Sequence, residues 1–410
     1  MISSPIKVAE YFAGIGLARI GMEQAGFHVV WSNDISEKKA KLFRARFGDN
    51  QDGHRYDVRD LNLVRASDIP TEVDVAWASF PCTDLSLAGT RGGIHSGSSA
   101  AFWSFARNLA HLGRRRPKAL VIENVTGFAS SHGGKDISLA IRTLNSLGYS
   151  MDVLSLDARR FVPQSRPRLF LIGVHKSIEA KITESDESSP LRPAWIEAVR
   201  ETPDVLMHRH SVAYPPDLLD SGLSSVVDKI PEDDERWWSA ERAQTAMESL
   251  SDTQLIRLSS LQSTGQITYR TAYRRMRAGI PRWELRPDDL SGCLRTARGG
   301  SSRQAVVRID GDSVRWRWMA GTEYAQLMGA EGFDLTTFSE SEIQWGFGDA
   351  VCVPAVKWIA EEYLAPILTR SNNTENEQAF TETKAVISSQ ERESRRNERP
   401  DGTISSDEAA

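Results

Sequence analysis

The stretch Ser79-Phe80-Pro81-Cys82-Thr83-Asp84-Leu85-Ser86 decides the fold of this chain. The apolar run before it, residues 73–78, predicts a buried strand, and Pro81 ends that strand because proline has no backbone N–H to donate. Cys82 is therefore expected on the turn that follows, and the residues after it are of types that begin helices. An open α/β sheet carries its reactive groups at this position. Cys82 is a candidate nucleophile, although a free cysteine considered alone is more often a small buried hydrophobic residue.

The composition indicates an ordinary globular chain with room for about two or three domains. Lysine and arginine number 50 against 55 aspartates and glutamates, so the net charge is −5 and a nucleic-acid partner would need a local basic patch. Cys82, Cys293 and Cys352 lie far apart, which predicts no disulfide framework, no zinc site and no metal. The sequence has no signal-peptide pattern and no membrane-spanning apolar run, so a reduced, cytoplasmic protein without membrane contact is expected.

The first part of the chain has the pattern of a nucleotide-type cofactor site. A strand over residues 6–12 runs into Ala13-Gly14-Ile15-Gly16-Leu17, and a helix ending at Gly26 follows. A second strand over residues 27–31 leads to Asn33 and Asp34, the strand–turn–helix–strand–acid layout that such sites use. Arg19 stands where a dinucleotide fingerprint has its third glycine, which disfavours NAD and leaves an adenosyl cofactor without a pyrophosphate. An acidic turn at residues 56–60 is a second candidate contact, for an adenine.

Further strands alternate with helix-length segments along the chain. Residues 118–125 form a buried strand that carries Glu123 near its end, and residues 154–158 and 168–174 predict two more. Residues 101–112 are expected to be helical, and the glycine- and serine-rich residues 87–99 to form a lid. This alternation predicts a parallel, doubly wound α/β sheet.

The composition changes near residues 179–189, where a domain boundary is expected. Residues 228–251, which include Trp237 and Trp238, predict a packing helix. Residues 269–317 carry many arginines interleaved with aromatic residues and no lysine, which favours a nucleic-acid face. Helical segments are expected again at residues 322–328 and 354–364, and the polar residues 369–410 are expected to be a disordered tail.

These groups suit one reaction better than others. Cys82, Glu123, Arg166 and Arg168 lie at the ends of different strands, and strand ends on one edge of a sheet converge on one pocket. A cysteine protease is disfavoured because no motif supplies a histidine base. A thiolate and a protonated carboxyl group suit addition to C6 of a pyrimidine, after which C5 becomes a carbon nucleophile that a methyl donor alkylates.

Several motifs occur together in one order over most of residues 8–363. They are Tyr11-Phe12-Ala13-Gly14-Ile15-Gly16, Asn33-Asp34-Ile35, Asp57-Val58, Phe80-Pro81-Cys82, Glu123-Asn124-Val125, Gln164-x-Arg166-x-Arg168, residues 318–329 with Glu323, and Gly346-x-Gly348-Asp349-Ala350-Val351-x-Val353-Pro354. In this order they resemble the motifs of bacterial DNA (cytosine-5)-methyltransferases. The resemblance implies S-adenosylmethionine as cofactor, S-adenosylhomocysteine as product, and a flipped cytosine in double-stranded DNA as substrate.

The resemblance also assigns residues to roles. It implies catalytic roles for Cys82, Glu123, Arg166 and Arg168, and no metal. It implies cofactor contacts from Phe12, Ala13, Gly14, Gly16, Leu17, Asp34, Ile35, Asp57, Val58, Pro81, Asp349, Ala350 and Val351. DNA contacts are expected from Ser86, Arg91, Gln164, Arg270, Arg274, Arg275, Arg295, Arg298 and Arg303.

The family's domain plan implies a Rossmann-like methyltransferase sheet with a smaller target-recognition domain inserted before the C-terminal helix. We expect residues 1–178 to form the first part of the catalytic domain, 179–334 the recognition domain, and 335–368 the return to the catalytic domain. A monomer is expected, with a cognate restriction endonuclease as a possible partner in a restriction-modification system.

Three positions depart from the family pattern. Thr83 replaces the usual glutamine, Asp34 the usual glutamate and Asp349 the usual asparagine, and none of these changes removes a group that the chemistry needs. Two other functions are open: methylation of RNA, and a DNA-binding module that keeps the fold without turnover. The long recognition region favours DNA, and the presence of Cys82, Glu123 and Arg168 favours catalysis.

Overall fold

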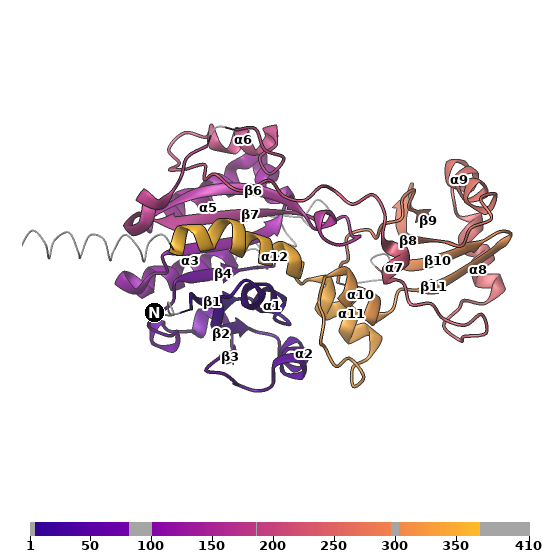
Figure 1. Ribbon diagram of the computed structural model, residues 1–410, viewed down its shortest axis with the longest axis horizontal. Helices are drawn as coiled ribbons and strands as arrows, with labels where there is room; N and C mark the ends of the chain where they lie inside the picture. The colour runs from indigo at the N-terminus through magenta and orange to yellow at the C-terminus, as the bar shows by residue number, and fades with distance from the viewer. Residues whose placement is uncertain (1–4, 82–100, 186, 297–302, 370–410) are drawn as a thin grey trace, which may run out of the picture.

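Seven strands form the larger sheet of the computed structural model, which describes residues 5–81, 101–185, 187–296 and 303–369. Their order across the sheet is β3-β2-β1-β4-β5-β7-β6 (Figure 1). The strands are β1 (Lys7–Tyr11), β2 (His28–Asp34), β3 (Arg55–Val58), β4 (Val75–Ala78), β5 (Ala119–Val125), β6 (Tyr149–Asp157) and β7 (Pro167–His175). Neighbouring strands are parallel except where β7 pairs with β5 and β6. The predicted doubly wound, mostly parallel sheet is confirmed.

Helices cover both faces of this sheet, which is why its central strands are apolar along most of their length. Helices α1 (Leu17–Gln24) and α12 (Val353–Ile359) pack on one face, and α3 (Ala101–Leu112) and α5 (Lys135–Ser146) on the other. A Cβ on Gly21 would lie 2.7 Å from the Cβ of Val356, so glycine lets α1 and α12 approach closely. The C-terminal helix α12 thus lies in front of the middle of the larger sheet, between β7 and β4 in Figure 1.

A second sheet of antiparallel strands forms a separate body, in the order β11-β10-β8-β9. Its strands are β8 (Thr268–Arg277), β9 (Ile280–Leu285), β10 (Ala305–Asp310) and β11 (Ser313–Trp318). Helices α8 (Ala240–Glu248) and α9 (Asp252–Gln262) pack on one face, around a core with Trp283 and Trp316. This body falls within the residues expected to form a recognition domain, and the predicted domain boundaries stay a prediction.

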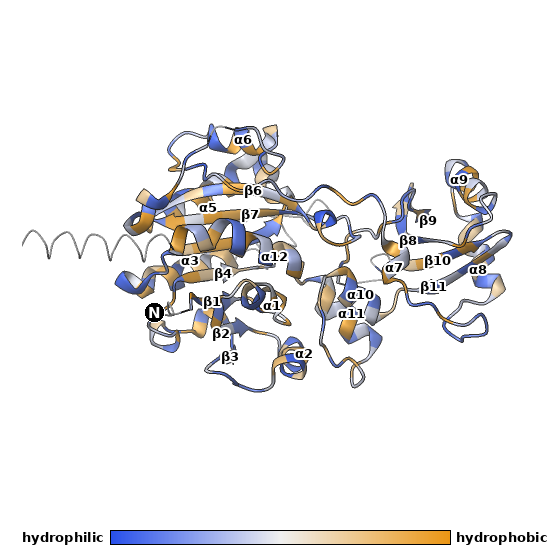
Figure 2. Cartoon of the chain, viewed as in Figure 1, coloured by the Kyte–Doolittle hydropathy of each residue, from blue (hydrophilic) through white to orange (hydrophobic). Residues whose placement is uncertain are grey.

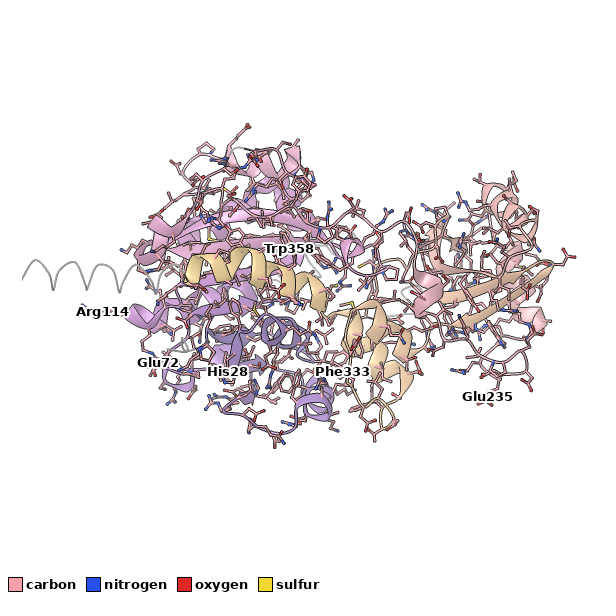
Figure 3. The ribbon with its side chains drawn as sticks, in the orientation of Figure 1. His28, Glu72, Arg114, Glu235, Phe333 and Trp358 are labelled. Atoms are coloured by element: carbon pink, nitrogen blue, oxygen red, sulfur yellow. The ribbon has the colours of Figure 1, made fainter. Side chains whose placement is uncertain are left out.

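A seam of buried residues joins the two bodies. Tyr269 of β8 and Val306 of β10 belong to the same hydrophobic cluster as α1 and α12. Helices α10 (Gly321–Leu327) and α11 (Glu340–Gly348) lie between the bodies in Figure 1. Figure 3 labels Phe333 near these helices, and its ring lies 5.2 Å from that of Phe347. Figure 2 shows hydrophobic colour along the inner strands of both sheets and hydrophilic colour on many outer loops.

The remaining helices connect these parts. They are α2 (Glu37–Phe47), α4 (Gly127–Ser130), α6 (Ala194–Arg200) and α7 (Leu223–Val226), and a π-helical turn, Ala360–Leu364, follows α12. No helix within the described ranges is both long enough and apolar enough to span a bilayer.

Two local predictions are wrong. Residues 56–58 belong to the edge strand β3 rather than to a turn, because Tyr56 packs on Phe43 of α2 and β3 pairs with β2. The helix predicted over residues 228–251 covers only α8, because Pro231 and four successive acidic residues precede it and Ser239 caps its first turn. The predicted lid at 87–99 and nearly all of the predicted tail lie outside the described residues.

Candidate active site

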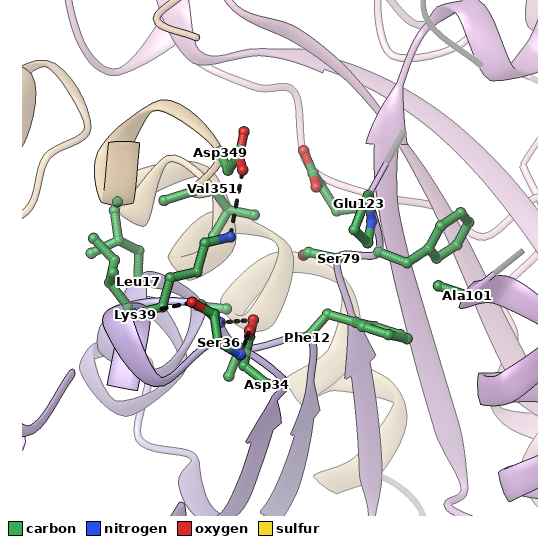
Figure 4. A pocket seen from close by; sticks show the side chains of 18 of the residues that line it. Phe12, Leu17, Asp34, Ser36, Lys39, Ser79, Ala101, Glu123, Asp349 and Val351 are labelled. Carbon is green, nitrogen blue, oxygen red and sulfur yellow. Dashed lines mark hydrogen bonds and ion pairs between the residues drawn. The ribbon is translucent and has the colours of Figure 1, made fainter. Parts of the chain in front are cut away.

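A cavity of about 940 Å³ opens at the carboxyl ends of the strands of the larger sheet, where open α/β sheets bind ligands. Its lining includes fourteen of the residues predicted as site residues: Phe12, Ala13, Gly14, Leu17, Asp34, Ile35, Pro81, Glu123, Arg166, Arg168, Arg295, Asp349, Ala350 and Val351. These residues come from both ends of the larger domain and from the segment after β9. Figure 4 shows part of this wall, with Phe12, Asp34 and Glu123 from three different strands or strand ends.

The turn after β1 forms one side of the cavity. Phe12 and Gly14 have positive φ angles of 57° and 59°, so the chain turns sharply here, and Gly14 brings no side chain into the cavity. The Asp34 carboxylate fixes this turn by accepting hydrogen bonds from the Gly14 amide (2.9 Å) and the Ser36 amide (2.8 Å). Ile35, which is 70% exposed, adds an apolar surface beside this carboxylate. An apolar wall beside a carboxylate and backbone groups suits an adenosyl group with its ribose.

The segment after α11 closes the opposite side. Asp349 accepts a hydrogen bond from the Thr296 hydroxyl (2.8 Å), and its carboxylate lies 3.5 Å from the Lys39 ammonium group (Figure 4). Lys39 also lies 5.1 Å from the centre of the Trp345 ring. These contacts join α2, the segment after β9 and the segment after α11 at one edge of the cavity.

Glu123 is the buried carboxyl group of the cavity. The Arg168 Nε lies 3.0 Å from its Oε1, and the Ser79 side chain hydrogen-bonds it as well. The Trp77 indole N–H donates to the Ser79 hydroxyl (3.0 Å), which fixes that hydroxyl near Glu123. Burial raises the pKa of Glu123 above its ordinary value, and this effect outweighs the lowering by the Arg168 and Arg166 guanidinium groups. Such a carboxyl group can hold a proton and donate it to a ligand in the cavity.

Arg166 is buried and holds three segments together. Its guanidinium group donates to the carbonyls of Leu294 (2.8 Å), Gly348 (3.3 Å) and Ala350 (2.6 Å). These three bonds join the larger sheet to the segment after β9 and to the segment after α11.

Cys293 reaches the same cavity from the segment after β9. Its Sγ lies 3.4 Å from Arg166 Nη1 and 3.7 Å from Arg168 Nη2. Burial raises the pKa of this thiol, but the Arg168 and Arg166 guanidinium groups outweigh that effect and bring its pKa below the ordinary value. A thiol with a lowered pKa therefore lies beside the arginine pair.

Three other predicted cofactor contacts, Gly16, Asp57 and Val58, are not in the cavity lining. Gly16 faces Phe43 and Phe47, 2.6 to 2.7 Å from where its Cβ would be, so a side chain there would collide with α2. Asp57 accepts a hydrogen bond from the Arg59 Nε (2.6 Å), and neither it nor Val58 lines the cavity. The segment that follows, with Arg59 to Asn62, lines it instead.

The predicted DNA contacts are divided between several places. Gln164 is fully buried: its amide donates to the Leu327 carbonyl (2.7 Å) and accepts from the Leu294 amide (3.1 Å), and its contact with DNA stays a prediction. Arg270, Arg274, Arg275 and Arg303 lie in the second body, and Arg275 pairs with Glu284 at 3.5 Å. Cys82, Ser86, Arg91 and Arg298 lie outside the described residues.

The family model for C-5 cytosine-specific DNA methylases matches residues 6–365. The chain belongs to this family. Within the ranges that the structure describes, no group of three or more histidine, cysteine, aspartate or glutamate side chains is arranged to hold a metal ion.

Individual relatives agree with this membership in the cytosine methylase family. The chain is 34% identical to the type II methyltransferase M.HpaII of Haemophilus parainfluenzae over 172 residues, which are 41% of this chain and 46% of that protein. It is 29% identical to the type II methyltransferase M.HhaI of Haemophilus parahaemolyticus over 168 residues, which are 41% of this chain and 48% of that protein. The matches therefore span about half the length of these curated relatives.

The fold of this cytosine methylase family member also matches a solved structure. The Dnmt2 methyltransferase of S. pombe superposes with a TM-score of 0.56 at 15% identity, over 89% of this chain and 99% of that one. This likeness supports the Rossmann-like methyltransferase fold that the sequence predicts.

Several cavity residues were not predicted from the motifs of the methylase family, among them Glu10, Lys39, Cys293 and Thr296. Glu10 could have been predicted, because burying an acidic side chain in a largely apolar strand is costly and is often found at functional sites. The other three come from α2 and from the segment after β9, and no local pattern distinguishes them from surface residues. Only the tertiary fold brings them to the cavity.

Proposed function

We propose that this chain transfers a methyl group from S-adenosylmethionine to C5 of a cytosine within a specific sequence of double-stranded DNA. The observation that carries the proposal is the pair of Glu123 and Arg168, 3.0 Å apart, in a cavity shared with the glycine turn after β1. A carboxyl group with a raised pKa beside a guanidinium group is what recognition and protonation of a pyrimidine edge require. The cavity lies next to Pro81, the last described residue before Cys82.

The glycine turn, Asp34, Ile35 and the Asp349–Val351 segment would hold the cofactor. The apolar side chains of Phe12 and Ile35 and the carboxylate of Asp34 fit an adenosine, and a cavity of about 940 Å³ leaves room for the methionine part and a cytosine. Bound there, S-adenosylmethionine supplies the methyl group and leaves as S-adenosylhomocysteine. The chain's own residues then have to bind the base and activate it.

Cys82 and Glu123 carry the activation. The Cys82 thiolate forms a bond to C6 of the cytosine while Glu123 gives its proton to N3, so the ring gains an electron pair at C5 and stays neutral. Arg168 holds the Glu123 carboxyl group and faces the base. After C5 has been methylated, loss of the C5 proton to a base expels the Cys82 thiolate, and the proton on N3 returns to Glu123. The ring atoms are inaccessible in a stacked duplex, so the cytosine has to be flipped out, at a cost of a few kcal/mol.

We assign DNA recognition to the region 179–334, whose second sheet carries the arginine-rich strands. The relatives are type II methyltransferases, which supports a role in the cytoplasm beside a restriction endonuclease of the same specificity. Monomeric action is part of this proposal, since one chain supplies every group named above.

The test is deamination-based sequencing of DNA from a host without cytosine methylation that expresses this chain. Wild type should protect cytosines in one short motif, and Cys82→Ala and Glu123→Gln should protect none. Cys352→Ala is the matched control, because Cys352 is a buried thiol outside the cavity lining, and it should protect the same motif.

Protection by Cys82→Ala would contradict the nucleophile assignment. If no variant protected DNA, the same chains would be tested on RNA by the same chemistry, and protection there would replace DNA as the substrate. A purified chain that binds S-adenosylmethionine but methylates neither nucleic acid would indicate a binding module.

A further inference from the structure

A second cavity, of about 360 Å³, lies in the body formed by the second sheet. Three indole rings form its wall: Trp238 before α8, Trp283 of β9 and Trp318 of β11. Their ring centres lie 5.0 to 5.7 Å apart, so the rings support one another in fixed positions. We call this cavity the tryptophan pocket. It shares no lining residue with the catalytic cavity.

Arginine side chains cover the faces of these rings. The Arg242 guanidinium group of α8 lies 4.2 Å from the centre of the Trp238 ring and 5.2 Å from that of Trp318. Arg242 and Arg274 line the pocket, and Arg303, which is not in its lining, lies 4.7 Å from the centre of the Trp318 ring. Among the described residues, no hydrogen bond or ion pair involves the Arg242 guanidinium group. A guanidinium group directs its N–H bonds within its own plane, so stacking leaves these donors available to an acceptor.

The arginines at the tryptophan pocket repel one another. Burial and the neighbouring Arg274 lower the pKa of Arg242, and burial lowers the pKa of Arg303, to which Arg242 also contributes. The charged groups in the lining are the guanidinium groups of Arg242 and Arg274 and the carboxylate of Glu241. Binding an anion would relieve the repulsion between the arginines.

The pocket lies within reach of a duplex held at the catalytic cavity. Thr296 lines the catalytic cavity, and Arg303 stacks on Trp318 seven residues later. Seven extended residues span at most about 25 Å, which is less than one turn of B-DNA, about 34 Å. The pocket and the cavity are therefore separated by a distance that a single duplex can span.

We propose that the tryptophan pocket binds a phosphate of the DNA backbone through Arg242, as an anchor outside the target sequence. This inference rests on the proposed function. A stacked base is disfavoured because the guanidinium groups already occupy ring faces, and a cationic ligand is disfavoured by the surplus of positive charge. Arg242 contacts no base in this arrangement, so it strengthens binding to any sequence equally.

The test measures binding of the full chain to a fluorescent duplex that carries the methylated motif and to one with the motif scrambled, from about 50 to about 200 mM KCl. Arg242→Gln should weaken binding to both duplexes equally and reduce the slope of log Kd against log salt by about one. The loss of affinity over this salt range should then be smaller by about three- to fourfold. Glu241→Gln should tighten binding to both duplexes.

Arg236→Gln is the matched control, because Arg236 belongs to the same body and already pairs with Asp234 at 2.7 Å. It should leave the slope unchanged, and the melting temperature of each variant shows that it is folded. An unchanged slope for Arg242→Gln, with wild type still methylating DNA, would overturn the phosphate anchor and leave the proposed function intact. The anchor would also be wrong if the loss of affinity in Arg242→Gln differed between the two duplexes. It would likewise be wrong if millimolar inorganic phosphate competed with DNA equally well for wild type and for Arg242→Gln. Wild type that neither binds nor methylates DNA would overturn both proposals.

Discussion

Glu10 is a buried carboxyl group in the wall of the cavity, and its pKa is strongly shifted. Its side chain is buried in β1, lines the cavity, and accepts a hydrogen bond from the Ser32 hydroxyl at 3.1 Å. The Ser32 hydroxyl in turn lies 2.9 Å from His54 Nε2. Burial raises the pKa of Glu10 to about 8 and lowers that of His54 to about 3, so both groups are neutral near pH 7.

The buried Glu10 should make stability fall as the pH rises. Its carboxyl group has an ordinary pKa of 4.5 and a folded-state pKa of about 8, so between these values the folded protein binds more protons than the unfolded chain. The free energy of unfolding should then decrease with pH, by at most about 1.4 kcal/mol per pH unit for this one group. Glu10→Gln removes the titration, so the melting temperature of wild type should fall relative to that of the variant between pH 5 and pH 8. Parallel curves would show that Glu10 is not the titrating group.

Cys293 and Cys352 should differ strongly in reactivity. The arginine pair brings the pKa of Cys293 below its ordinary value, whereas burial raises the pKa of Cys352 to about 12. Because the thiolate is the reactive form, iodoacetamide at pH 7 should alkylate Cys293 much faster than Cys352, and peptide mass spectrometry resolves the two. S-Adenosylmethionine plus DNA should slow the reaction of Cys293, since both would fill the cavity. Equal rates for the two thiols would contradict the electrostatic assignment.

Residues of the cavity could be predicted from sequence wherever a motif fixes both the residue and its place at a strand end. Glu123 and Arg168 follow from this rule, and the structure places them 3.0 Å apart. Gln164 shows its limit: the motif includes it, but its amide is used to hold two backbone segments. Cys293 lies 125 residues from its partner Arg168, so its approach depends on how the two bodies pack, and no local pattern encodes that.

At the scale of elements, a buried ion pair fastens β11 to α10. Arg317 Nη1 donates to Glu323 Oε2 at 2.8 Å, and Glu323 also accepts from the backbone amides of Asp228 (2.8 Å) and Ala320 (2.7 Å). Both side chains are fully buried. One carboxylate therefore joins the acidic segment before α8, the end of β11 and the start of α10.

Breaking this pair should be costly. Arg317→Met leaves the Glu323 carboxylate buried without its counter-charge, so the free energy of unfolding should fall by about 3–5 kcal/mol. The cost should be clearly smaller in a Glu323→Gln background, where no charge is left behind. Arg315→Met on the same strand is the control: Arg315 forms an exposed pair with Glu232, so its loss should change stability by no more than about 1 kcal/mol. Urea unfolding of wild type, the two single variants Arg317→Met and Glu323→Gln, their double variant and Arg315→Met measures these costs. Equal costs for Arg317→Met in both backgrounds would exclude the uncompensated Glu323 charge as the cause.

Elements were predictable where local pattern and burial agree. The helix over residues 101–112 matches α3 residue for residue, because its apolar spacing and the helix face that packs on the sheet coincide. The edge strand β3 was missed because it has only four residues and is stabilised by β2 and Phe43 rather than by its own propensity. The second sheet was not predicted as a sheet, since its arginine-rich strands lack the apolar alternation that identifies strands.

At the scale of the whole molecule, two hydrophobic cores meet at one seam. The second sheet has its own core on the α8 and α9 side, and on its other side Tyr269 and Val306 join the core of the larger domain. The catalytic cavity takes Cys293 to Thr296 from beyond this seam, so the seam determines where these residues lie relative to Glu123. The shape of this cavity therefore depends on packing between the two bodies, at residues such as Tyr269 and Val306 that do not line it.

Tyr269→Ala should lower the stability of the second sheet and leave that of the larger sheet unchanged. Removing a buried aromatic side chain from the seam costs about 3 kcal/mol, and this loss should fall on the second sheet because its contact with the larger core is reduced there. Hydrogen exchange should show protection of β8 to β11 reduced about a hundredfold, while β1, β4 and β5 keep theirs. Tyr273→Ala is the control, because Tyr273 is on the same face of β8 but outside the shared core, with the Arg275 guanidinium group 4.9 Å from its ring centre. It should change the hydrogen-exchange protection of neither sheet. An equal loss of protection in both sheets would mean that the seam makes them one cooperative unit, and the recognition and catalytic parts would then open only by unfolding together.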